Sequence, residues 1–200
     1  SVYADDHRGH GVTGKKQVAS GATKTMGNLG KGGIKAAFEQ VHEMTNIIKA
    51  ENPGVKLVLF GHSYGSFISQ KLINQYSNEY DAAILSGSSL LVPGVLGAGG
   101  FNKKWDKEPG ATGYEWLSRD KEVGKAFAAD PHTFYAAAAK VFGVPNAIQL
   151  FFTPKRGIRT DLPLLLQAGS DDPIGAERGN EMLANTYRNK CGLENVTAII

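Results

Sequence analysis

The pentapeptide GHSYG at residues 61–65 is the feature that most constrains the fold of this chain. A Gly-x-Ser-x-Gly sequence lets the backbone turn sharply from a strand into a helix, which leaves the serine hydroxyl exposed at the tip. Residues 57–60 before it are apolar without alternation, as in a parallel strand covered on both faces. Apolar residues recur at helical spacing after it, in residues 66–80. We therefore expect a nucleophile elbow with Ser63 at its tip; the alternative is a glycine-rich turn with an incidental serine.

Strand and helix patterns alternate along most of the chain. We expect strands at residues 1–6, 56–60, 81–89, 162–172 and 195–200. A glycine-rich loop runs to about Gly33, and helices are expected at residues 34–48, 66–80 and 176–192. Strands separated by helices, with right-handed crossovers between them, predict an α/β fold with a mostly parallel sheet and helices on both faces.

Residues 90–155 interrupt this alternation. They begin with the glycine-rich stretch LLVPGVLGAGG and hold more than half of the aromatic residues of the chain. We expect an insertion with its own apolar surface, so that the core comprises residues 1–89 and 156–200. Most of its aromatic side chains are expected to pack the insertion against the core. Trp105 and Phe134 are candidates for lining a pocket over the elbow that buries an apolar substrate.

The composition is that of an ordinary globular domain, with 42% hydrophobic residues, 20% charged residues and a net charge of +3. The lysines are spread along the chain without a basic stripe, so we expect no nucleic-acid partner. The lone Cys191 excludes an internal disulfide and favours a reducing, cytoplasmic location. No apolar run reaches membrane-spanning length, and no signal peptide is visible. His7 and His10 lack a second cluster that would complete a metal site, so we expect no metal and no other cofactor.

The elbow serine needs two chemical partners. A serine hydroxyl is a weak nucleophile and requires a general base and an acid that orients the base. In enzymes built on an elbow, these follow in the order serine, acid, histidine. Asp171 and Asp172 end the apolar stretch LPLLLQAGSDD, at the same rim of a parallel sheet as the elbow. Either is a candidate for the acid, and either has the alternative role of capping a helix that begins near Ile174.

None of the five histidines follows these aspartates. His42 lies in a predicted helix and is expected at the surface or half-buried. His62 occupies the variable position of the elbow, where we expect it to point away from the partner of the serine. His132 is expected to cap or pack rather than to catalyse. The base is therefore missing from the expected triad.

Four blocks of sequence resemble the α/β-hydrolase family of bacterial lysophospholipases and monoacylglycerol lipases, also grouped as serine aminopeptidase-like hydrolases. The blocks are DDHRGHG in the first eleven positions, GHSYGS at 61–66, YEWLSRDKEV followed by ADP between 114 and 131, and LPLLLQAGSDDPIG at 162–175. The resemblance implies that Ser63 is the nucleophile and that the backbone N–H of Tyr64 is one oxyanion donor. It implies that Asp172 is the triad acid, because the aspartate of the family stands three positions after a glycine, here Gly169. It also implies a helical cap at about residues 90–155 over an acyl-binding pocket.

The chain departs from the family pattern at both ends. In this family the histidine lies in a loop just beyond the strand that NVTAII matches. A His-Gly loop with the second oxyanion donor precedes the strand in which this chain begins. We therefore expect the purified protein to be longer than the 200 residues given, and these residues alone to be inactive.

The function that the resemblance implies is hydrolysis of a carboxylic ester through an acyl-enzyme at Ser63. Its substrate would be a small ester or a lipid, and the cap would make transient contact with a membrane surface. Two alternatives stay open: a non-catalytic binding or regulatory protein on a hydrolase scaffold, and an acyltransferase that uses the same elbow. The sequence does not indicate the oligomeric state.

Overall fold

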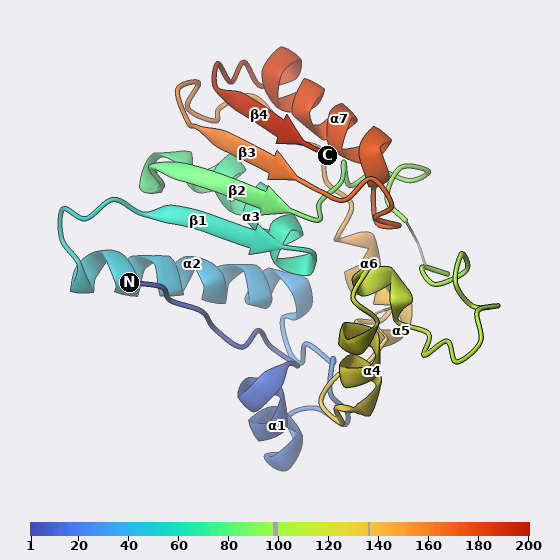
Figure 1. Ribbon diagram of the computed structural model, residues 1–200. Coiled ribbons are helices and arrows are strands. Elements are labelled where there is room, and N and C mark those ends of the chain that lie inside the picture. Colours follow the sequence, from blue (N-terminus) through green and yellow to red (C-terminus); the bar gives the residue numbers. More distant parts are fainter. Residues whose placement is uncertain (98–99, 136) are drawn as a thin grey trace.

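A four-stranded parallel sheet forms the centre of the computed structural model, which describes residues 1–97, 100–135 and 137–200. Its strands lie in the order β1 (Val58–His62), β2 (Ala82–Ser86), β3 (Leu164–Gln167) and β4 (Val196–Ile199). The helices beside it are α2 (Gly33–Glu51), α3 (Tyr64–Tyr76) and α7 (Ala176–Asn185), and a π-helical turn η3 (Thr186–Lys190) extends α7. Figure 1 shows α2 running alongside β1 and α7 alongside β4. The α/β fold with a mostly parallel sheet is confirmed.

One face of this sheet is packed and the other is open. Leu85 of β2 and Leu166 of β3 are fully buried in a core that α3 and α7 complete. The strand register places Phe60 and Ile199 on the opposite face, where their side chains are 59% and 60% exposed. Within the described residues, helices therefore cover one face of the sheet, whereas we expected helices on both faces.

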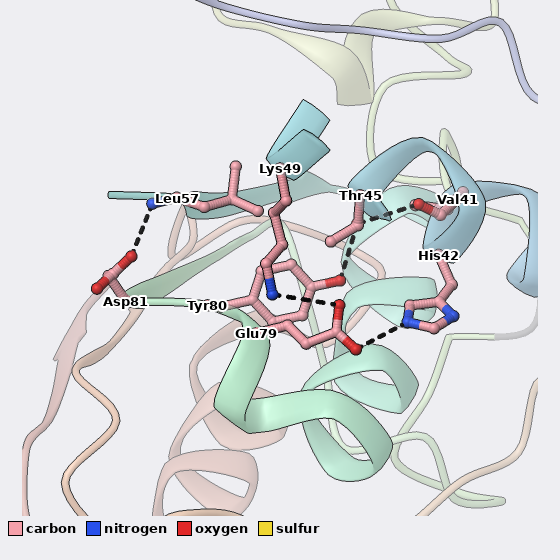
Figure 2. Close-up of polar contacts among 8 residues, drawn as sticks. All are labelled: Val41, His42, Thr45, Lys49, Leu57, Glu79, Tyr80 and Asp81. Carbon is pink, nitrogen blue, oxygen red and sulfur yellow. Dashed lines mark hydrogen bonds and ion pairs between the residues drawn. The ribbon is translucent and has the colours of Figure 1, made fainter. Parts of the chain in front are cut away.

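Polar contacts fasten α2 to the turn that precedes β2, a 3₁₀ turn η1 at Ser77–Glu79 (Figure 2). His42 Nε2 lies 3.0 Å from Glu79 Oε1, and its ring stacks on Tyr76 with ring centroids 3.6 Å apart. Thr45 Oγ1 lies 3.0 Å from the hydroxyl of Tyr80, and burial raises the pKa of Tyr80 to about 12. His42 is thus half-buried, as expected, in a structural cluster on the packed side of the sheet.

Residues 90–155 contain four short helical elements and none of the sheet's strands within their described part. These elements are η2 (Glu115–Leu117), α4 (Lys121–Ala129), α5 (Ala138–Val141) and α6 (Val144–Ile148). An isolated antiparallel bridge joins Leu91 to Phe152, so the two ends of this segment lie side by side, as an insertion requires. In Figure 1 the arrows of the strands point toward the side on which α4 to α6 lie. The exact limits of the insertion stay a prediction.

The N-terminal region differs from expectation in two places. Residues 1–6 form no strand, because their backbone pairs with no other strand in the described chain. The loop expected before Gly33 contains a helix, α1 (Gly11–Ala19), that has no apolar stripe by which the sequence could reveal it. A Cβ on Gly14 would lie 2.4 Å from the carbonyl carbon of Gly9, so close backbone packing rather than side-chain burial places α1. None of the helices in the described ranges is long and apolar enough to cross a membrane.

Candidate active site

Ser63 stands at a strained turn between β1 and α3. Its φ of 51° and ψ of −121° lie in a backbone region that non-glycine residues rarely adopt. Gly61 allows the turn to close, because a Cβ at this position would lie 2.4 Å from Ser69 Oγ and 2.6 Å from the carbonyl oxygen of Gly65. The predicted strand–turn–helix geometry of a nucleophile elbow is present.

Tyr64 follows as the first residue of α3. Its backbone N–H is among the first N–H groups of the helix, which have no carbonyl acceptor within the helix, so it is free to bind an anionic oxygen. Its side chain packs between His7 and Phe142, with ring centroids 5.6 and 5.1 Å away. Burial raises the pKa of the Tyr64 hydroxyl well above its ordinary value, so this hydroxyl stays protonated.

The two candidate acids lie in different environments. Asp171 is 59% exposed and forms an ion pair with Lys104 at 2.8 Å, which lowers the pKa of Asp171. Asp172 is half-buried, and burial raises its pKa although its Oδ1 accepts a hydrogen bond from the backbone N–H of Ile174 at 2.9 Å. Neither aspartate caps α7, because the N-cap position is Gly175. The capping alternative holds in part, because the Asp172 side chain accepts the N–H of Ile174 in the turn that leads into α7.

The parallel register explains how residues far apart in sequence meet at one rim. His62 at the end of β1 pairs with Ser86 of β2, which pairs with Gln167 of β3. Ser63 directly follows the end of β1, and the loop that carries Asp172 follows the end of β3. Because the carboxyl ends of parallel strands lie at the same edge, both side chains reach the same space.

A cavity of about 560 Å³ occupies this space. Ser63, Asp172 and Trp105 line it, together with residues of the 115–119 segment. Phe134, the other predicted pocket residue, is not among the lining residues; its ring lies 5.4 Å from that of His10. The structure therefore brings Trp105 to the cavity that contains Ser63 and leaves Phe134 beside the DDHRGHG segment.

His62 lies near the candidate acid. It lines the same cavity as Ser63 and Asp172, and its Nδ1 lies 3.1 Å from Ser86 Oγ. Its ring and an Asp172 carboxylate oxygen both approach Gly87, at 3.3 and 3.4 Å from the position of a Cβ on that glycine. His62 and Asp172 thus approach Gly87 from the same cavity. Sequence reasoning missed Ser86 and Gly87, whose place follows only from strand pairing.

The remaining histidines lie outside this cavity. His7 is 3.3 Å from Asp5, and the pKa of Asp5 is lowered by this neighbour. His132 Nδ1 is 2.9 Å from Asp130 on the exposed surface. Within the described residues, no group of three or more histidine, cysteine, aspartate or glutamate side chains is arranged to hold a metal ion.

A parallel sheet with a serine elbow after one strand and a half-buried aspartate after another defines the α/β-hydrolase fold. The chain belongs to the family described as serine aminopeptidase, S33, whose model matches residues 1–194. A monoacylglycerol lipase of Mycolicibacterium smegmatis is 27% identical over 203 residues, in an alignment that covers 92% of this chain and 64% of that protein. The chain thus spans less than two thirds of the length of this curated relative.

Solved structures of the same fold agree. A thermostable carboxyl esterase from Bacillus coagulans superposes with a TM-score of 0.80 at 22% identity, over 98% of this chain and 70% of that chain. A soluble variant of monoglyceride lipase from Saccharomyces cerevisiae superposes with a TM-score of 0.62 at 18% identity, over 97% and 65% of the two chains. These similarities confirm the fold that the four sequence blocks implied.

Proposed function

We propose that this protein hydrolyses carboxylic esters through an acyl-enzyme at Ser63. The observation that carries the proposal is the strained conformation of Ser63 at the end of β1, in one cavity with the half-buried Asp172. Membership of a serine hydrolase family supports it.

Each residue has a defined role in this mechanism. Ser63 Oγ attacks the ester carbonyl carbon while a histidine takes its proton, and the backbone N–H of Tyr64 stabilises the oxyanion that forms. The histidine returns the proton to the leaving alcohol, and water then attacks the acyl-enzyme to release the acid. Asp172 orients the histidine and stabilises its charged form. The resemblance to the family implies a base after the last strand, and we give that role to no residue of this chain.

The substrate class that we propose is a glycerolipid ester such as a monoacylglycerol. The similarity to a monoacylglycerol lipase and to a monoglyceride lipase supports this class. Trp105, Trp116 and Ile174 give the cavity apolar walls suited to an acyl chain. We propose that residues 90–155 form the cap that carries two of these walls.

The test of the proposed function is turnover of short-chain and long-chain monoacylglycerols by the purified protein and by Ser63→Ala. We expect the substitution to abolish turnover and to abolish labelling by a fluorophosphonate. Turnover that persists in Ser63→Ala with the label on another residue would contradict the assignment.

We also propose transient contact between the cap and a lipid surface. Val144 and Ile148 lie one helical turn apart on α6, and each is 60% exposed. Phe151, which follows α6, is exposed as well. Sedimentation with phosphatidylcholine vesicles tests this contact: Val144→Ser combined with Ile148→Ser should weaken binding, and unchanged binding would argue against it.

A further inference from the structure

We propose that four buried polar residues, Ser66, Gln70, Ser88 and Asn180, are positioning residues that hold Ser63 and Asp172 at a fixed spacing. The inference rests on the proposed roles of Ser63 and Asp172. All four side chains belong to residues with 0% exposure, and none lines the cavity. Burying polar groups is unfavourable unless they are hydrogen-bonded, so such a cluster between two catalytic loops calls for a physical reason.

The first half of this network reaches the elbow. Ser66 Oγ lies 2.6 Å from the carbonyl oxygen of Ser63 and 2.9 Å from Ser88 Oγ. Gln70 Nε2 lies 3.0 Å from Ser88 Oγ and 2.9 Å from the carbonyl oxygen of Ser89. The side chain of Ser88 is therefore the point at which α3 and the segment after β2 are joined.

The number of protons on each group decides which one donates in each of these hydrogen bonds. A hydroxyl has one proton, and the carbonyl of Ser63 can only accept, so the proton of Ser66 belongs to the 2.6 Å contact. Ser88 must then donate to Ser66, and Gln70 donates to Ser88. The chain of donors runs from Gln70 through both hydroxyls to the carbonyl of Ser63, and each bond in such a chain polarises the next.

The second half of the network reaches the acid loop. Asn180 Nδ2 donates to the carbonyl of Ser88 at 2.9 Å and to the carbonyl of Ala176 at 2.8 Å. The N–H of Ala176 donates in turn to the carbonyl of Asp172 at 2.8 Å. Since both partners of Asn180 Nδ2 are carbonyl oxygens, the orientation of this amide is fixed by its surroundings. Ser88 thus binds the elbow through its side chain and the acid loop through its backbone.

Close packing holds the start of α7 and the Ser88–Ser89 segment in a fixed relative position. A Cβ on Gly175 would lie 2.5 Å from Ser89 Cβ, and a Cβ on Gly179 would lie 2.5 Å from Ser89 Oγ. The start of α7 therefore rests directly on the Ser88 carbonyl and the Ser89 side chain. Ala176 keeps a φ of 47°, a conformation that persists only where the surroundings impose it.

The kinetic test compares Ser88→Ala with Thr45→Val. Both substitutions remove a buried hydroxyl that has a hydrogen-bonded partner, but the Thr45–Tyr80 contact joins α2 to the residues just before β2 (Figure 2), and neither residue lines the cavity. We expect Ser88→Ala to lower kcat about tenfold to a hundredfold, as displacement of catalytic groups by an ångström can do, with KM changed by less than about threefold. Thr45→Val should lower the urea midpoint alone. Equal kcat values for the two variants would overturn the proposal.

Asn180→Leu provides an independent variant if Ser88→Ala does not fold. It keeps the number and branching of the side-chain heavy atoms and removes only the contacts on the acid-loop side. The same loss of kcat is expected, and a kcat equal to that of the unaltered protein would overturn the proposal.

Amide hydrogen exchange separates this proposal from the proposed function, because it needs no turnover. We expect Ser88→Ala to speed exchange at residues 63–67 and also at 172–180, while Thr45→Val leaves both segments unchanged. Faster exchange in both segments of a protein that hydrolyses no ester would support the positioning network and refute ester hydrolysis. Faster exchange in only one segment would show that Ser88 does not couple the two loops.

Discussion

Lys104 Nζ lies 2.8 Å from the carboxylate of Asp171, and this contact joins the 90–155 segment to the loop that carries Asp172. Both side chains are 59% exposed, so the pair should contribute at most about 1 kcal/mol to the free energy of unfolding. We expect its effect on the cavity to be larger than its effect on stability. Lys104→Met should raise KM at low ionic strength, and salt of about 0.5 M should bring the unaltered protein to the same KM by screening the pair.

Lys121→Met is the control for this prediction. Lys121 forms a similar exposed pair with Glu108 at 3.5 Å, within the 90–155 segment and away from the acid loop. It should leave KM and its salt dependence unchanged. Equal effects of the two lysine substitutions would show that the Lys104–Asp171 pair has no particular influence on the cavity.

Asp172→Asn should abolish turnover and yet stabilise the protein at neutral pH. Burial raises the pKa of Asp172, so the ionised carboxylate is less favourable in the folded than in the unfolded chain. This penalty is fully present at pH 7 and disappears as the pH falls below 3.8, where both states hold the proton. Urea unfolding at pH 7 and at low pH measures the difference, and turnover should fall about 10⁴-fold. A variant that is less stable than the unaltered protein at pH 7 would contradict this account.

The two glycines of the pentapeptide should respond differently to alanine. A Cβ on Gly61 would lie 2.4 Å from Ser69 Oγ, whereas the nearest atom to a Cβ on Gly65 is His7 Nε2 at 3.9 Å. Gly61→Ala should therefore cost about 1–3 kcal/mol and disturb the elbow. Gly65→Ala, in the first turn of α3, should keep the fold and gain up to about 1 kcal/mol from helix propensity. Urea unfolding of both variants tests this, and similar losses of stability at the two positions would count against it.

The sequence predicted those parts of the site that depend on local order along the chain. The position of Ser63 could be predicted because the strand, turn and helix around it are contiguous in sequence. Its place at the same edge as Asp172 could be predicted because the sheet is parallel. His62 could not be predicted in the same way, because its partner Ser86 and its neighbour Gly87 are brought to it by strand pairing.

The polar network could not be predicted from the sequence for the same reason. Ser88 and Asn180 are 92 positions apart, and although each lies in an expected strand or helix, no local pattern pairs the two residues. Their burial reverses the usual preference of polar side chains for the surface, so composition gives no sign of it. The strand expected at residues 1–6 was wrong for a related reason, since a short sequence cannot supply the neighbour with which a strand must pair.

Trp105 and Phe134 allow the cavity wall to be tested with a matched pair of aromatic truncations. Both side chains are half-buried in the 90–155 segment, but only Trp105 lines the cavity that contains Ser63. Trp105→Ala removes apolar wall from the proposed acyl site, so it should shift the preferred acyl chain length and lower the selectivity between neighbouring lengths. Phe134→Ala should reduce stability, because its ring packs against His10 and beside Gly27, and should leave the chain-length profile unchanged. The measurement is kcat/KM over a series of p-nitrophenyl esters, with urea unfolding for each variant. A profile that changes with Phe134→Ala and not with Trp105→Ala would place the acyl chain on the DDHRGHG side of the molecule instead.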